Sequence, residues 1–223
     1  MQRKLLAEAI GCLLLSTTVI GSGIMAEQLA AGNAALALLA NTAATVAVLL
    51  CLIGLLAPIS GAHFNPAVSL SLALLGKHGW REMLLYSLVQ IIFCCLGTLL
   101  AHAMFALPLL QTSTQVRTGG AQWLAEVVAT FGLLLVVLGH RRASDAPWLV
   151  ATWIGAAYWF TASTSFANPA ITIARSLTDS FSGIRPADAP GFIAAQLCGA
   201  ALACWISKAL FTPDHQNPTS HMQ

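Results

Sequence analysis

Long stretches without charged residues dominate this chain of 223 residues and restrict what it can fold into. Six of them, each 19 to 25 residues long, contain at most one glutamate or histidine. They are residues 5–26, 34–58, 83–106, 120–139, 146–166 and 189–207. A helix needs about 20 apolar residues to cross the hydrocarbon core of a bilayer, so these runs predict six transmembrane helices. The first run is longer than the apolar region of a signal peptide, and we interpret it as a retained helix.

The composition excludes several classes of protein. Only 8% of the residues are charged and the mean hydropathy is +0.78, whereas about 25% of the residues of an average soluble domain are charged. A soluble enzyme and a disordered chain are both ruled out. The net charge of +2 gives no indication of nucleic-acid binding, and the six cysteines lie in apolar runs without metal-ligand spacing. We therefore expect no metal, no cofactor and no nucleic-acid partner.

Two further apolar segments, residues 66–76 and 169–178, are too short to span a membrane. Each begins with the same three residues, Asn65-Pro66-Ala67 and Asn168-Pro169-Ala170. Asparagine is a favoured N-cap, and proline is favoured at the first helical position because its missing N–H has no helical partner there. Both segments are therefore predicted to be re-entrant half-helices that start inside the membrane.

The two halves of the chain match. Glu8 lies in the first span and Glu126 in the fourth, and one Asn-Pro-Ala segment follows two spans in each half. Three spans per repeat is an odd number, so the second repeat is inverted relative to the first. The sequence thus predicts an all-α membrane protein, with one channel domain over residues 1–223 and inverted repeats over about 4–106 and 120–211. Such repeats with short proline-interrupted segments are typical of a transport site near the bilayer midplane.

The paired half-helices predict a passive channel for uncharged solutes. Their N-termini carry partial positive charge that repels cations, and the amides of Asn65 and Asn168 offer hydrogen-bond donors. Glu8 and Glu126 are expected to accept hydrogen bonds from the re-entrant loops, since non-helical backbone at this depth needs protein partners. The alternative is a proton relay in an ion-coupled secondary transporter. An intramembrane enzyme is not supported, because the two glutamates are equivalent rather than a differentiated acid and base.

The distribution of cations predicts the orientation. Seven lie on the side of the two chain ends: Arg3, Lys4, Lys77, Arg81, Arg141, Arg142 and Lys208. Three lie on the other side: Arg117, Arg175 and Arg185. The bias favours a plasma (inner) membrane protein with both ends in the cytoplasm.

Residues 60–68, Ser-Gly-Ala-His-Phe-Asn-Pro-Ala-Val, resemble the first signature of the aquaporin/aquaglyceroporin (major intrinsic protein) family. Residues 166–170, Phe-Ala-Asn-Pro-Ala, resemble the second, and the resemblance covers about residues 4 to 211. It implies a right-handed bundle of six transmembrane helices and two half-helices, with one pore in each subunit of a homotetramer. The chain resembles divergent bacterial members of the family, some of which are linked to metalloid movement.

The second signature departs from the family pattern, in which an arginine follows Asn-Pro-Ala directly, because this chain has Ile171 there. Counting back from the asparagines as in the family places the other positions of the narrow filter at Thr45, Ala156 and Ser165, with Tyr158 as the alternative to Ala156. Such a filter is wider and less polar than that of a water-only channel, since an aliphatic chain replaces five donors. It favours solutes such as glycerol, urea or undissociated metalloid acids; a water-only channel is the alternative.

Arg175 lies one helical turn after Ile171. It either turns into the outer vestibule, where it supplies part of the missing charge, or points outward to the membrane surface or to Asp179. His63, just before the first Asn-Pro-Ala, is either a pH-sensitive group or a loop histidine satisfied by its neighbours.

Overall fold

The computed structural model describes residues 1–140 and 142–211, and all regular structure in that part of the chain is helical. The elements in chain order are α1 (Gln2–Leu29), α2 (Ala34–Ser60), α3 (Pro66–Leu74), α4 (Trp80–Met104), α5 (Gly120–Gly139), the 3-10 turn η1 (Ala143–Asp145), α6 (Ala146–Phe160), α7 (Pro169–Arg175) and α8 (Ala189–Phe211). Helices satisfy their own backbone groups, which hydrocarbon requires of any segment that crosses it. The all-α class and the two half-helices, α3 and α7, are confirmed.

Five helices, α1, α2, α4, α5 and α8, are long and apolar enough to cross a bilayer. The expected span over residues 146–166 differs, because α6 ends at Phe160 after 15 residues. The remainder of that run, Thr-Ala-Ser-Thr-Ser-Phe, is rich in hydroxyl side chains that offer the backbone alternatives to a helix. Thr164 and Ser165 have positive φ angles of 59° and 49°, which end the helical path. The freed segment becomes the loop that leads to α7.

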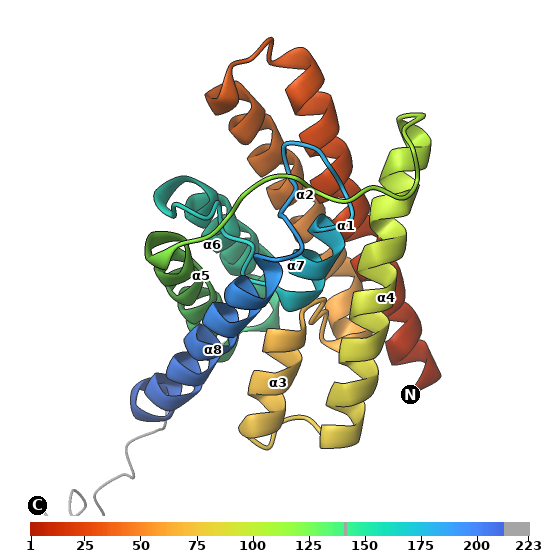
Figure 1. The fold of residues 1–223 in the computed structure, drawn as a ribbon. Helices are drawn as coiled ribbons and strands as arrows, with labels where there is room; N and C mark the ends of the chain where they lie inside the picture. The colour runs from red at the N-terminus through yellow and green to blue at the C-terminus, as the bar shows by residue number, and fades with distance from the viewer. Residues whose placement is uncertain (141, 212–223) are drawn as a thin grey trace, which may run out of the picture.

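The half-helices begin as their sequences predict. Asn65 caps α3 and Asn168 caps α7, each in an extended conformation with a proline at the start of the helix that follows. Figure 1 shows α3 running from the centre of the molecule toward the lower edge, and α7 lying at the centre above it. The start of α1 and the end of α8 lie at the same lower edge, which we call the termini side. The opposite edge, where α1 connects to α2, is the far side.

The packing of the long helices repeats between the two halves. Helix α1 packs against α2 and α4, and α5 packs in the same way against α6 and α8. The closest crossings need glycine: a Cβ at Gly97 on α4 would lie 2.9 Å from the Cβ of Ser16 on α1, and one at Gly199 on α8 would lie 3.2 Å from the Cβ of Thr130 on α5. Small residues let membrane helices approach closely. The bundle thereby forms a rigid frame around the half-helices.

The outer surface of the bundle is apolar. Leucines and tryptophans from several helices stand out from it, and the most exposed include Leu55, Leu84, Leu124 and Trp205. Soluble monomers rarely show contiguous apolar surface of this extent. The chain is therefore an integral membrane protein whose polar groups are gathered inside.

Candidate functional site

Asn65 and Asn168 meet at the centre of the molecule through reciprocal hydrogen bonds. The Nδ2 atom of Asn65 donates to the carbonyl of Ala167 at 2.8 Å, and Nδ2 of Asn168 donates to the carbonyl of Phe64 at 2.8 Å. Each asparagine Oδ1 accepts a bond from the backbone N–H two residues later in its own half-helix. These bonds join the two half-helix N-termini tip to tip, as the inverted repeat predicts.

A carboxylate behind each re-entrant loop holds the loop in place. Glu8 accepts hydrogen bonds from the backbone N–H groups of His63 and Phe64, at 3.0 and 2.8 Å. Glu126 accepts the equivalent bonds from Phe166 and Ala167, both at 2.8 Å. Both glutamates are fully buried. Each carboxylate thus replaces the helical partners that these backbone donors lack.

Two glutamines that sequence reasoning missed complete this support. Gln90 on α4 donates to Glu8 at 2.8 Å and to Ser69 at 3.1 Å. Gln196 on α8 donates to Glu126 at 2.6 Å and to the hydroxyl of Thr172 at 2.8 Å. The signal was a single glutamine near the middle of an apolar span, once in each repeat.

The loops that the glutamates hold adopt a backbone that L-residues rarely adopt. Ala62 and Phe64 before the first asparagine both have φ of 48°, and Ser165 and Ala167 before the second have φ of 49° and 48°. None of the four is glycine, so the left-handed conformation costs about 1–3 kcal/mol at each. Matching strain in both repeats indicates that the surrounding bonds impose this path. It directs the Phe64 and Ala167 carbonyls to the opposing asparagines.

A cavity of about 250 Å³ passes the asparagine pair. Residues of α1, α2, α3, α5, α6 and α7 line it, and most of them are aliphatic. Asn65 and Asn168 both border it, and an amide nitrogen carries two donors. Since only one donor of each asparagine is used in the reciprocal pair, each retains one N–H for a passing solute.

On the far side of the asparagines the cavity reaches the expected filter positions. Thr45, Ser165 and Ile171 all line it. Ala156 does not: it is exposed on the outside of α6, and Tyr158, two residues later, lines the cavity instead. The structure therefore corrects Ala156 to Tyr158. The error arose because no motif fixes the register of α6, and a shift of two residues turns a helix by about 200°.

Arg175 turns inward. Its side chain is 2% exposed and lines the cavity. Its Nε donates to the carbonyl of Ser182, its Cζ lies 3.4 Å from the ring centroid of Phe166, and its Nη1 is buried without a hydrogen-bond partner. The outward orientation is wrong, since Asp179 instead accepts bonds from the backbone N–H and hydroxyl of Thr114, which lower its pKa.

Other polar atoms gather around the same point. The hydroxyl oxygens of Thr45 and Tyr158 lie 3.3 Å apart, and the Ser165 hydroxyl is buried without a partner. Together with Arg175 Nη1 they border the cavity on the far side of the asparagines. A polar solute at this constriction is offered donors that the protein itself leaves unused.

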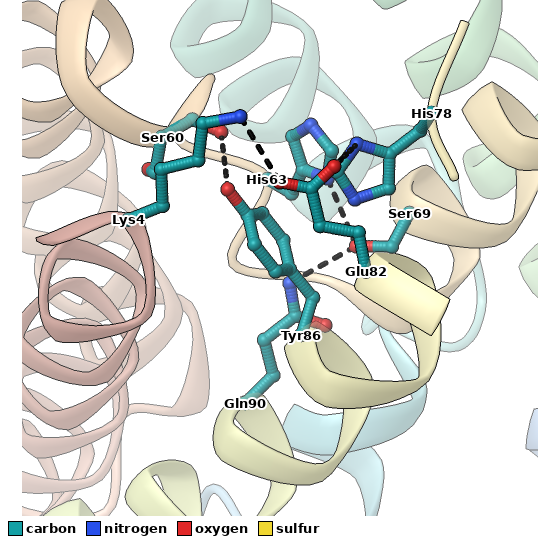
Figure 2. Close-up of polar contacts among 8 residues, drawn as sticks. All are labelled: Lys4, Ser60, His63, Ser69, His78, Glu82, Tyr86 and Gln90. Atoms are coloured by element: carbon teal, nitrogen blue, oxygen red, sulfur yellow. Dashed lines mark hydrogen bonds and ion pairs between the residues drawn. The ribbon is translucent and has the colours of Figure 1, made fainter. Parts of the chain in front are cut away.

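Neutral aromatic groups form the mouth on the termini side. Figure 2 shows His63, His78 and Tyr86 packed against one another, with ring centroids 4.8 to 5.0 Å apart. His63 borders the cavity and its Nδ1 lies 2.9 Å from the Ser69 hydroxyl, so it is a loop histidine with a polar partner.

His78 is the more unusual member of this mouth. Its Nδ1 lies 3.7 Å from the carboxylate of Glu82, which also binds Lys4 at 3.0 Å (Figure 2). Its Nε2 is buried without a hydrogen-bond partner. Burial lowers the pKa of His78 from its usual range, and the Glu82 carboxylate opposes that shift.

The comparisons with known proteins agree with this geometry. The model of the family "Major intrinsic protein" matches residues 1–159. Aquaglyceroporin AqpS of Rhizobium meliloti is 54% identical over 217 residues, which cover 96% of this chain and 92% of that protein. A probable glycerol uptake facilitator protein of Thermotoga maritima is 30% identical over 69% of this chain and 71% of its own length.

The fold has a solved counterpart. The X-ray structure of the aquaglyceroporin from Plasmodium falciparum superposes with a TM-score of 0.73 over 95% of this chain and 97% of that one, at 20% identity. The family match ends before the second Asn-Pro-Ala, the region in which this chain departs from the usual signature. Within the part that matches, and in the relative that spans nearly all of it, the agreement leaves one assignment: the chain belongs to the major intrinsic protein family.

Proposed function

We propose that this protein is a passive channel for small uncharged solutes, namely water and larger molecules of the size of glycerol, urea or an undissociated metalloid acid. Members of its family are channels and not enzymes. The observation that carries the proposal is the reciprocal asparagine pair on the wall of a mainly aliphatic cavity. A solute with lone pairs accepts the free amide donors, whereas a cation loses its hydration and meets only donors and partial positive charge.

The constriction suits a solute with a polar and an apolar side. Thr45, Tyr158, Ser165 and Arg175 supply polar groups, and Ile154 and Ile171 supply aliphatic wall. Because Tyr158 and Arg175 enter the filter, it is narrower and more polar than the Thr, Ala, Ser and Ile set expected from the sequence. Arg175 takes the role of the arginine that the family usually carries at the position of Ile171. The names of the two relatives, an aquaglyceroporin and a probable glycerol uptake facilitator, support a polyol among the solutes.

Glu8 and Glu126 act as supports rather than as a proton relay. Each carboxylate already accepts at least three hydrogen bonds from its re-entrant loop and from a glutamine. Neither glutamate belongs to the cavity wall. An ion-coupled transporter needs a titratable group in the path, and this arrangement disfavours it.

The wider assembly follows the family. We infer one channel domain over residues 1–223 with inverted repeats over about 4–106 and 120–211, a homotetramer, and a plasma membrane location with both ends in the cytoplasm. The burial of Arg175 and the partial burial of Arg117 sharpen the charge asymmetry, because they leave Arg185 as the exposed arginine of the far side in the described residues. Light scattering of the detergent-solubilised protein tests the tetramer, and a terminal fluorescent reporter tests the orientation.

The function is tested in proteoliposomes by stopped-flow light scattering with water, glycerol, urea and arsenous acid, each with and without an imposed proton gradient. We expect downhill flux of water and at least one larger solute, unaffected by the gradient. Accumulation above equilibrium would show coupled transport. Water flux without any larger solute would show the water-only alternative. Empty liposomes and the Asn65→Asp, Asn168→Asp double variant, which places carboxylates at the midplane, are the controls.

A further inference from the structure

The inference concerns what holds Arg175 in the constriction, and it rests on the filter role proposed above. Among the described residues, the Arg175 guanidinium has a single hydrogen-bond acceptor, the carbonyl of Ser182. Ser182 belongs to the loop between α7 and α8, outside the half-helix that carries Arg175. The direction of the guanidinium therefore depends on how firmly that loop is fixed.

Arg117, in the segment between α4 and α5, grips this loop on both sides of Ser182. Its Nε donates to the Gly183 carbonyl at 2.7 Å, and its Nη2 donates to the Phe181 carbonyl at 3.2 Å. Its Nη1 reaches the Ser163 carbonyl, in the loop before α7, at 3.4 Å. One guanidinium thus joins the segments that precede and follow the second half-helix. Figure 1 shows the α4–α5 segment crossing the upper half of the molecule above α7.

The backbone of Arg117 is itself anchored. Its N–H donates to Asp188 Oδ2 at 2.9 Å, and the neighbouring Gln115 carbonyl accepts a bond from the backbone of Arg185 at 2.7 Å. The pKa of Asp188 is lowered, chiefly by the hydrogen bond from Arg185, so the carboxylate that holds this backbone stays ionised at neutral pH. Arg117 therefore has little freedom to follow a loop that moves.

Phe166 connects the two arginines. The Cζ of Arg175 lies 3.4 Å from its ring centroid and the Cζ of Arg117 lies 5.2 Å from it, both within the range of a cation–π interaction. The Phe166 backbone is held by Glu126. Arg175 borders the cavity, but Arg117 does not.

From this arrangement we propose that Arg117 is a positioning residue: it fixes the carbonyls on either side of Ser182, and thereby the Ser182 carbonyl and the Arg175 guanidinium that bonds to it. A planar fork with five donors suits three carbonyls in fixed directions, whereas a lysine ammonium does not reproduce that geometry. The selectivity of the channel thus depends on a residue that no solute touches.

The test is a double-mutant cycle in proteoliposomes, with the glycerol-to-water permeability ratio as the readout. A ratio does not change with the amount of folded protein. Loss of one charge-assisted hydrogen bond is worth about 1.5–3 kcal/mol, so we expect Arg175→Met to shift the ratio by roughly tenfold. Arg117→Met should shift it in the same direction by about threefold, with Arg117→Lys in between, and the double variant should match Arg175→Met alone.

The matched control is Arg185→Met, which removes an arginine of the same loop whose side chain binds Asp188 and makes no bond to residues 181–183; its ratio should stay at the wild-type value. A wild-type ratio in Arg117→Met, or shifts of the two arginines that multiply in the double variant, would overturn the positioning role. If Arg175→Met itself leaves the ratio unchanged, the proposed filter fails instead. Should Arg117→Met not fold, Arg117→Lys in the wild-type and Arg175→Met backgrounds gives the same comparison.

Discussion

At the midplane the two repeats contribute matching groups, and at the far-side constriction they do not. Glu8 and Glu126, Gln90 and Gln196, and Asn65 and Asn168 form the same bonds in both halves. The constriction has no such symmetry, because its cation and its anchoring loops come from the second repeat and from the segment between the repeats. Exclusion of ions can be built from a repeated unit, whereas choice among neutral solutes needs groups that differ along the path.

The largest expected effect breaks the symmetric region. Glu8→Ala and Glu126→Ala each leave at least three buried donors without a partner, and each orphaned group costs about 1–3 kcal/mol. Both variants should lose most of the folded protein, to a similar degree, in fluorescence-detected size-exclusion chromatography.

Glu82→Ala is the control for these two variants, because it removes only the partly exposed ion pair with Lys4, which is worth about 0–1 kcal/mol. A strong loss for one buried glutamate and none for the other would show that the two halves are not equivalent supports.

An intermediate effect is expected at the asymmetric region. Ile171→Arg places a second guanidinium on the cavity wall one turn before Arg175, and we expect it to narrow the filter and lower the glycerol-to-water ratio by about tenfold, the scale of one strong polar contact. The measurement is stopped-flow light scattering, with Ile171→Val as the size-conserving control. An unchanged ratio would place the constriction elsewhere.

The smallest effect concerns the mouth on the termini side. Burial lowers the pKa of His78 in the folded protein, so its neutral form stabilises the fold above the unfolded pKa of about 6.5. That stability is lost as the pH falls below this value, because protonation must occur beside His63, Tyr86, Glu82 and Lys4 in a site that disfavours the charge. The melting temperature should therefore fall between pH 6.5 and 5 by more than in His78→Gln. Equal acid sensitivity of the two proteins would remove His78 from this account.

The symmetric region could be predicted from the sequence because local rules determine it. Asn-Pro-Ala is an N-cap followed by a first-turn proline, and its repetition at matching places fixes the pairing of the half-helices. The glutamates were found because a charge inside an apolar run is rare. Gln90 and Gln196 were missed only because an uncharged amide stands out less.

The asymmetric region could not be predicted in the same way. Whether Arg175 points in or out depends on the Ser182 carbonyl, which lies seven residues further along the chain in a loop without a regular pattern. Arg117 reaches the same loop from 64 to 66 residues away, and no spacing in the sequence indicates that contact. The choice between Ala156 and Tyr158 depended on where α6 ends, which the hydroxyl-rich segment after Phe160 decides.

The most direct test of the central claim, that Arg175 supplies the polar contact of the constriction, is a cryo-electron microscopy structure of the full-length protein in lipid nanodiscs with glycerol. The account predicts glycerol beside Thr45 and Tyr158, with a hydroxyl about 3 Å from the Nη1 atom of Arg175. An Arg175 side chain turned out of the cavity, or a constriction that binds glycerol without touching it, would contradict the account.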